Sequence, residues 1–128
     1  ESMEFRAMRL KKIDPPRVFK VGSFGSSINL SHVIDLNLDP DEQVTLIGDN
    51  GGEFDICRKS WGYYATPSIN HRLKDFGYRT CIVESSGRRY LHLVEQEKIN
   101  EYLKYLEEQR MKILFWLDED KISIEENG

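Results

Sequence analysis

Hydrophobic and polar residues alternate along the first half of the chain, which is the pattern of β-strands. A long strand is predicted over residues 28–38, with one face formed by Ile28, Leu30, His32, Ile34, Leu36 and Leu38. A shorter strand is predicted over 17–21, and the Gly/Ser-rich residues 22–27 are predicted to form the turn between the two. Before them, Asp14-Pro15-Pro16 is expected to stop regular structure, because proline lacks a backbone N–H.

Two more strands, over 43–47 and 53–58, are predicted to form a hairpin. The sequence Gly48-Asp-Asn-Gly-Gly52 between them contains Asn-Gly and Gly-Gly, which adopt positive φ at little cost and are typical of tight turns. The acidic residues around this turn lack the spacing of an EF-hand loop, so the sequence predicts no calcium site.

In the second half, two segments show a helical period. A first helix is predicted over 66–76, with Thr66 as N-cap, Pro67 at the first helical position and Gly77 just after its end. Its apolar stripe consists of Ile69, Leu73 and Phe76. A second helix is predicted over 96–110, with an apolar stripe of Ile99, Tyr102, Leu103 and Leu106.

Three further strands are predicted around these helices, over 78–83, 89–94 and 111–117. The first two are expected to be joined by a turn at 85–88. Strands gathered ahead of helices are typical of an α+β fold. The predicted architecture is therefore a mostly antiparallel sheet with two helices packed on one side.

Length and composition are those of a folded soluble domain. The 128 residues are 39% hydrophobic and 31% charged, which suffices for one domain with a core. We expect an N-terminal arm over 1–16, a single domain over 17–118 and an acidic tail over 119–128, and Glu1-Ser2 ahead of Met3 reads as a cloning remnant. No apolar run has the length of a membrane span or a secretion signal, so we expect a cytoplasmic protein without a membrane partner.

Charge is distributed unevenly along the chain. Residues 58–89 carry seven basic and two acidic side chains. The segment before them carries six basic and ten acidic side chains, and the segment after them five and ten. An acidic chain with one basic segment favours a local anionic ligand over an extended nucleic-acid surface.

The sequence contains none of the patterns that mark metal or nucleophile chemistry. His32, His71 and His92 are isolated, without the spacing of a zinc site. Cys57 and Cys81 lie in predicted strands among apolar residues, where buried, reduced thiols are expected. We therefore predict no metal and no cofactor, and a disulfide only if the two cysteine-bearing strands pair.

The basic segment opens with the densest group of aromatic, basic and hydroxyl side chains in the chain, and Trp61 to Tyr64 are predicted to form an aromatic loop between the strand end at Arg58-Lys59 and the helix start. Its rings offer faces on which sugars or bases stack, its cations attract anions, and the predicted helix start adds backbone N–H groups. The predicted ligand-binding residues are Arg58, Lys59, Trp61, Tyr63, Tyr64, Thr66, Ser68, Asn70, His71 and Arg72. The alternative is a structural role, in which the rings pack the helix on the sheet and the basic groups are solvated.

Three stretches of the chain resemble a small, uncharacterised family of bacterial proteins: residues 41–45, residues 53–70 and Trp116-Leu117-Asp118. The likeness runs from about Ile28 to Asp118, and its mark is the motif RKxWGxYATPS at residues 58–68. The family is loosely associated with surface-polysaccharide genes, which implies a role beside sugar-modifying enzymes. The motif carries no assigned chemistry, so no catalytic residue follows from the resemblance.

Together these observations predict a cytoplasmic accessory or binding protein of bacterial glycan biosynthesis. Its expected partner is an anionic sugar, a sugar nucleotide or a glycan-pathway enzyme, bound through residues 58–72. Two alternatives stay open: a small enzyme that uses His71 or Cys57 at the same loop, and a binder of single-stranded nucleic acid on Trp61 and Tyr63, which the overall acidity disfavours. A homodimer is also considered, through exposed strand edges and the apolar run 111–117.

Overall fold

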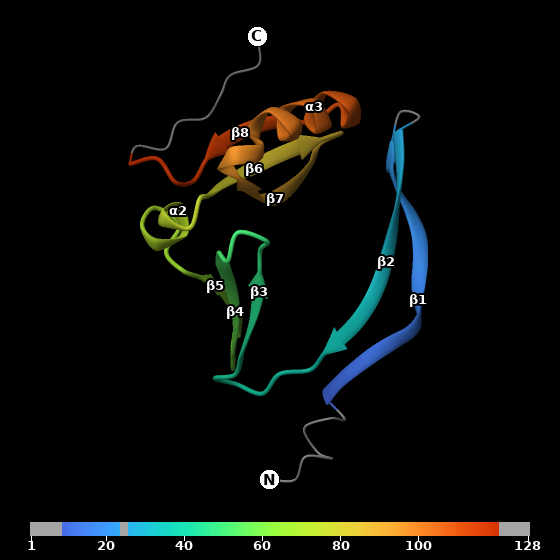
Figure 1. Ribbon diagram of the computed structural model, residues 1–128, viewed down its shortest axis with the longest axis vertical. Helices are drawn as coiled ribbons and strands as arrows, with labels where there is room; N and C mark the ends of the chain where they lie inside the picture. The colour runs from blue at the N-terminus through green and yellow to red at the C-terminus, as the bar shows by residue number, and fades with distance from the viewer. Residues whose placement is uncertain (1–8, 24–25, 121–128) are drawn as a thin grey trace.

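The computed structural model describes residues 9–23 and 26–120. Their strands form three antiparallel sheets, and two short α-helices accompany them (Figure 1). The predicted α+β class with mostly antiparallel sheet is therefore confirmed. Within the described ranges, no helix has the length and apolar character needed to cross a membrane.

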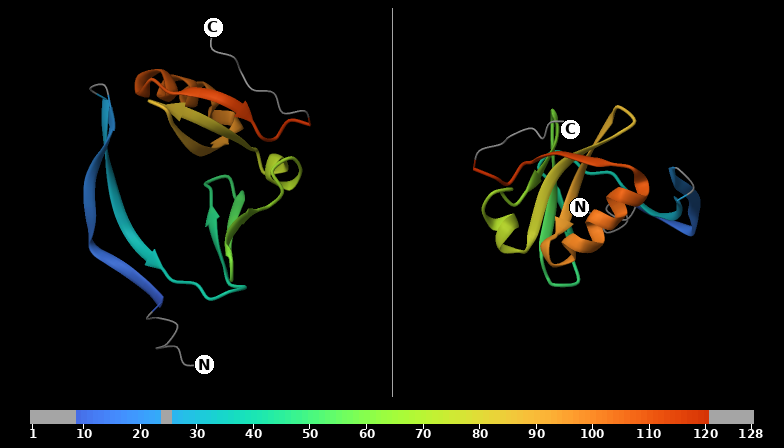
Figure 2. Two further views of the ribbon diagram at one scale, coloured as in Figure 1. Left: turned by 180° about the vertical axis from the view of Figure 1, so that it is seen from behind. Right: turned by 90° about the horizontal axis from the view of Figure 1, so that it is seen from above.

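The first sheet is a two-stranded ribbon of β1 (Leu10–Ser23) and β2 (Ser26–Leu36). It stands to one side of the other two sheets in every view (Figures 1 and 2). The predicted stop at Asp14-Pro15-Pro16 is wrong, because β1 continues through these residues. The prolines do interrupt the pairing between Lys12 and Arg17, since they cannot donate to the ladder while their φ suits an extended chain. Of the predicted turn 22–27, positions 24 and 25 lie outside the described residues.

The second sheet holds β3 (Gln43–Ile47), β4 (Glu53–Lys59) and β5 (Gly62–Thr66) in that order. The predicted hairpin between β3 and β4 is confirmed, and it closes with hydrogen bonds of 2.9 Å between the backbones of Gly48 and Gly52 and of Gly51 and Gly48. The expected loop of aromatic residues after β4 is wrong. A tight turn leads straight into β5, because its Tyr and Thr residues favour a strand that pairs with β4.

The first predicted helix is also wrong in extent. Thr66 is the last residue of β5, and the α-helix α2 spans only Arg72–Asp75. Pairing of β5 with β4 outweighs the capping signals of Thr66 and Pro67, since cap propensity is a weak local preference beside a full strand ladder. The predicted end is right: Gly77 has φ +89° and donates its N–H to Lys74 O over 2.8 Å.

The third sheet contains β6 (Tyr78–Ser85), β7 (Arg88–Glu95) and β8 (Lys112–Trp116), in the order β7-β6-β8. The 3₁₀ helix η1 (Gln96–Lys98) leads into α3 (Ile99–Gln109), and α3 packs on one face of this sheet (Figure 1). The core between them consists of Cys81, Val83, Val94 and Leu106. The strands and the second helix predicted for this half of the chain are confirmed.

Candidate functional site

The pairing of β4 with β5 divides the predicted site between two faces of one sheet. Arg58 lies opposite Tyr63, and Cys57 lies opposite Tyr64. Because successive side chains of a strand point to opposite faces, Arg58 and Tyr63 share one face. Lys59 and Tyr64 therefore lie on the other face, with Cys57.

On the first face, the Arg58 guanidinium is held within the sheet. Its Nη1 donates to the Tyr63 hydroxyl over 3.2 Å, and its Nε donates to the Lys59 carbonyl over 2.8 Å. The guanidinium carbon also lies 5.3 Å from the centre of the Tyr63 ring, a cation–π distance. Arg58 and Tyr63 thus form a cross-strand pair that stabilises the sheet.

On the second face, Trp61 and Tyr64 form a stacked pair of aromatic rings. Their ring centres lie 6.5 Å apart, with 20° between the planes. Trp61 is 70% exposed and Tyr64 47% exposed. Aromatic rings with this much exposed area present apolar faces to water. A flat or ring-shaped ligand covers such faces when it binds.

A shallow pocket of about 230 Å³ adjoins this ring pair, lined by Asp41, Glu42, Gln43, Cys57, Lys59 and Tyr64. Lys59 Nζ forms an ion pair of 2.5 Å with Asp41 Oδ1, and Cys57 Sγ donates to Gln43 Oε1 over 3.3 Å. The hydrogen bond and the charge of Asp41 raise the pKa of the Lys59 ammonium. The hydrogen bond with Cys57 raises the pKa of the Tyr64 phenol, so both groups stay protonated at neutral pH.

Of the remaining predicted residues, Thr66 is the last residue of β5, and Ser68, Asn70, His71 and Arg72 lie beyond that end of the strand. Gly62 and Thr66 are separated by about 13 Å along an extended strand, so the ring pair and the segment 68–72 occupy opposite ends. In that segment Ser68 Oγ accepts from the Arg72 backbone N–H over 3.4 Å, and the Arg72 guanidinium lies 5.9 Å from the centre of the Phe76 ring.

Asn70 and His71, which lie in the segment 68–72, are exposed. Since α2 begins at Arg72 and has only four residues, it provides no helix N-terminus beside the aromatic rings. Residues 58–72 are therefore distributed over three places: the Arg58–Tyr63 face, the Trp61–Tyr64 face with Lys59, and the α2 end with Ser68, Asn70, His71 and Arg72.

The geometry gives no support to a Cys57–His71 pair. Cys57 is buried in β4 with Gln43 as its acceptor, whereas His71 is exposed next to α2. Among the described residues, no contact joins the two side chains. The cysteine-bearing strands β4 and β6 belong to different sheets, and Cys57 and Cys81 are free thiols.

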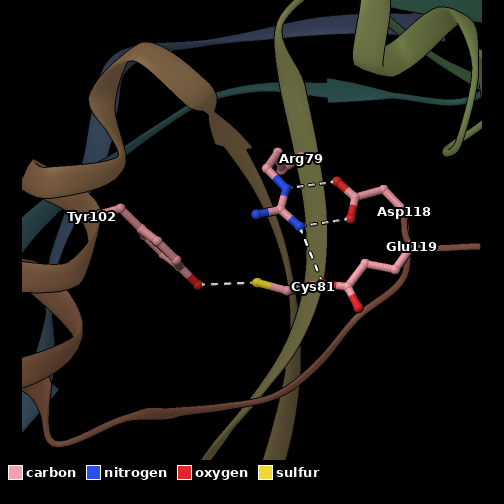
Figure 3. A network of polar contacts seen from close by, with 5 residues as sticks. All are labelled: Arg79, Cys81, Tyr102, Asp118 and Glu119. Atoms are coloured by element: carbon pink, nitrogen blue, oxygen red, sulfur yellow. Dashed lines mark hydrogen bonds and ion pairs between the residues drawn. The ribbon is translucent and has the colours of Figure 1, made fainter. Parts of the chain in front are cut away.

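Sequence reasoning did not find a polar network inside the third sheet. Tyr102 of α3 directs its hydroxyl at the Cys81 thiol of β6 over 3.3 Å, as Figure 3 shows, and at His92 Nδ1 of β7 over 2.7 Å. Burial raises the pKa of Cys81 and Tyr102 and lowers the pKa of His92. Cys81 and His92 are register partners, a relationship that only strand pairing reveals.

His92 also lines a cleft of about 610 Å³ between the third sheet and the far end of the ribbon. The ribbon contributes Ile28 and Leu30, and β7 and α3 contribute Tyr90 and Tyr105. The cleft is thus mainly an apolar space closed on one side by the ribbon.

Within residues 9–23 and 26–120, no group of three or more His, Cys, Asp or Glu side chains could hold a metal ion.

No protein-family model, curated protein or solved structure matches this chain. The resemblance of residues 53–70 to a bacterial family therefore stays a prediction from the sequence.

Proposed function

We propose that the protein is a binding protein that recognises a sugar ring on the second face of β4 and β5. The observation that carries this proposal is the exposed, stacked pair of Trp61 and Tyr64 beside a polar pocket. Binding sites for small polar molecules combine an apolar surface with a few polar groups that fix orientation. The ring pair supplies the apolar surface, and the pocket supplies the polar groups.

The charges of the pocket favour a hydroxyl-bearing ligand over a phosphate. Asp41 and Glu42 contribute two carboxylates, of which Glu42 is paired with Arg9 over 3.1 Å, and the single cation of the lining, Lys59, is paired with Asp41. Carboxylates accept hydrogen bonds from ligand hydroxyls, and the Gln43 amide and Lys59 can donate to ligand oxygens. Of the predicted ligands, a sugar or the sugar part of a sugar nucleotide therefore fits best.

The cellular setting of the proposal rests on the motif RKxWGxYATPS. Residues 58–68 carry it, and they include both members of the ring pair, Trp61 and Tyr64. On this basis we propose a cytoplasmic accessory role in bacterial glycan biosynthesis, with a glycan-pathway enzyme as the protein partner. The proposed sugar site does not depend on this setting.

Calorimetric titration with neutral sugars, anionic sugars and uridine diphosphate sugars tests the proposed site. Saturable binding is expected for at least one sugar, and Trp61→Ala and Tyr64→Ala should each weaken it about tenfold, because each removes one stacking face. Tyr63→Ala is the matched control. Tyr63 is 57% exposed and adjacent in sequence, but it lies on the opposite face.

Inorganic phosphate and a short single-stranded oligonucleotide serve as competing probes. If only these bind, and the affinity falls steeply with salt, the ligand is an anion and not a sugar. The proposal is also wrong if Tyr63→Ala weakens sugar binding as much as Trp61→Ala does, or if no sugar binds at millimolar concentration.

A further inference from the structure

The ribbon of β1 and β2 has one apolar face and one polar face. Register partners point to the same face, so Phe19 and Leu30 lie together, as do Leu10 and Leu36. The apolar face consists of Leu10, Phe19, Val21, Ile28, Leu30, Ile34 and Leu36, together with Lys12, Arg17 and His32. The opposite face carries mostly serine, asparagine and lysine, with Val18 and Val33 as exceptions.

Nothing in the described part of the chain covers this apolar face. Leu10 is 51% exposed, Leu30 45%, Leu36 43% and Phe19 40%. Only the two ends of the face approach other elements: Leu10 and Leu36 line a pocket with Val44, and the far end lines the cleft beside Tyr90. The ribbon therefore presents a row of large apolar side chains to water.

A free two-stranded ribbon is marginally stable in water, so a partner must cover it if it is to hold this form. The whole chain exposes 9656 Å², whereas a compact monomer of 15.0 kDa exposes about 7,000 Å². The chain therefore exposes about 2,600 Å² more than a compact monomer. This is an upper value for the additional surface that the ribbon exposes, because the total includes residues outside the described ranges. A stable interface of standard size needs about 800 Å² from each partner.

We propose that a second copy of this chain covers the ribbon, with the two apolar faces packed on each other around a two-fold axis. A face of this kind is complementary to itself, since it offers apolar side chains in both halves, with Lys12, Arg17 and His32 between them. The charged side chains on the apolar face determine the relative direction of the two ribbons. Lys12 and Arg17 lie on the apolar face in the half that contains Leu10 and Leu36, so an antiparallel crossing keeps the cations of the two copies apart.

This interface differs from the surface predicted from the apolar run 111–117. In the structure, the residues of β8 pair with β6, and Met111, Ile113 and Trp116 pack on the core of the third sheet. The ribbon makes no comparable contact with a core. It is the better candidate for a contact between copies.

Sedimentation velocity of the full chain over a range of concentrations tests the proposal. The wild-type protein is expected to sediment with twice the mass of one 15.0 kDa chain at micromolar concentration. Leu30→Asp should raise the dimer dissociation constant about a hundredfold, because it places a carboxylate among the apolar side chains of the contact, in the half of the face that also lines the cleft. Val33→Asp is the control. Val33 is 50% exposed in the same strand but lies on the opposite face, so this variant should stay dimeric.

Hydrogen exchange of the wild-type protein keeps the test independent of any variant. Amides of residues 26–36 should become better protected as the concentration rises, while those of β6 do not change. A wild-type protein that stays monomeric at all concentrations overturns the proposal, and so does a dimer that Val33→Asp and Leu30→Asp weaken equally. A monomer that acquires mass only with added cell extract indicates a different protein partner and also overturns it.

Discussion

The hydroxyl of Tyr78 lies against the backbone of Gly48, in the space that a side chain at position 48 would occupy. Gly52 makes a similar approach, since a Cβ there would come within 2.6 Å of Tyr78 Cε2. Tyr78 is buried, and Asn50 Nδ2 donates to the Phe76 carbonyl over 3.2 Å. The turn between β3 and β4 is thus packed on the start of β6, and its glycines permit the close approach of two sheets.

Gly48→Ala is expected to lower the free energy of unfolding by about 1–3 kcal/mol, because the added methyl group overlaps the Tyr78 hydroxyl. Urea unfolding measures the loss. The same change in a Tyr78→Phe background should cost much less, since the next ring atom, Tyr78 Cζ, lies 3.4 Å from the added Cβ. An equal loss in both backgrounds would show that the hydroxyl contact is not the cause.

Arg79→Met should destabilise the protein by about 2–4 kcal/mol, because it leaves the Asp118 carboxylate buried without its cation. Arg79 Nε and Nη2 bind the two oxygens of Asp118 over 2.9 and 3.0 Å, as Figure 3 shows, and Asp118 is only 1% exposed. The guanidinium also lies 3.8 Å from the centre of the Trp116 ring. Thermal and urea unfolding give the stability of the variant.

The double variant Arg79→Met with Asp118→Leu is the control for this ion pair. It removes both charges and retains apolar contact with Trp116, so it should recover most of the lost stability. If the double variant is as unstable as Arg79→Met alone, the loss comes from packing and not from the uncompensated carboxylate.

Stability should decrease as the pH falls below about 6.5, the ordinary pKa of histidine in an unfolded chain. Burial lowers the pKa of His92 in the folded protein. Between the two pKa values the unfolded chain binds the extra proton, so the contribution of neutral His92 is full above pH 6.5 and decreases as the pH falls towards the folded-state value. Tyr102 and Cys81 beside it stay protonated, because their pKa values are raised.

Urea unfolding between pH 5.5 and about 7.5 measures this dependence. His92→Gln should flatten the curve, and His71→Gln, at an exposed position, should leave it unchanged. A curve that keeps its slope in His92→Gln would assign the dependence to another group.

Cys81 should react with a maleimide at least about a hundredfold more slowly in the native protein than in urea, because its thiol has no exposed surface and burial raises its pKa. Mass spectrometry of the Cys57→Ser variant follows Cys81 alone. Native labelling at the unfolded rate would show that the packing of α3 on β6 opens readily, contrary to the buried Tyr102–Cys81 contact.

Much of the third sheet could be predicted because its signals are local. The stripe of Ile99, Tyr102 and Leu106 has the period of a helix, and the turn at 85–88 separates two alternating runs. These patterns need no knowledge of distant residues. The Tyr102–Cys81–His92 network could not be predicted, since it depends on which strands pair and on where the helix crosses them.

The stretch 58–72 shows the opposite case. Thr66-Pro67-Ser68 has the residues of a helix start, but Tyr63, Tyr64 and Thr66 pair with β4 and extend the sheet instead. Proximity in sequence suggested one site of ten residues. Strand alternation and the length of β5 separate these ten residues in space. Of the ten, Trp61, Tyr64 and Lys59 stay together.

Residue type at short spacing was enough to predict the second helix, the turns at 48–52 and 85–88, the amphipathic character of β2 and most strands, but not β5 or the first part of β1. Contacts between distant segments settle which side chains share a face, that the turn between β3 and β4 packs against Tyr78, and that the apolar side chains of the ribbon stay partly exposed within the described chain. Hydrophobic periodicity indicates that one face of a strand or helix is buried. It contains no information on whether the same chain or a second one buries it.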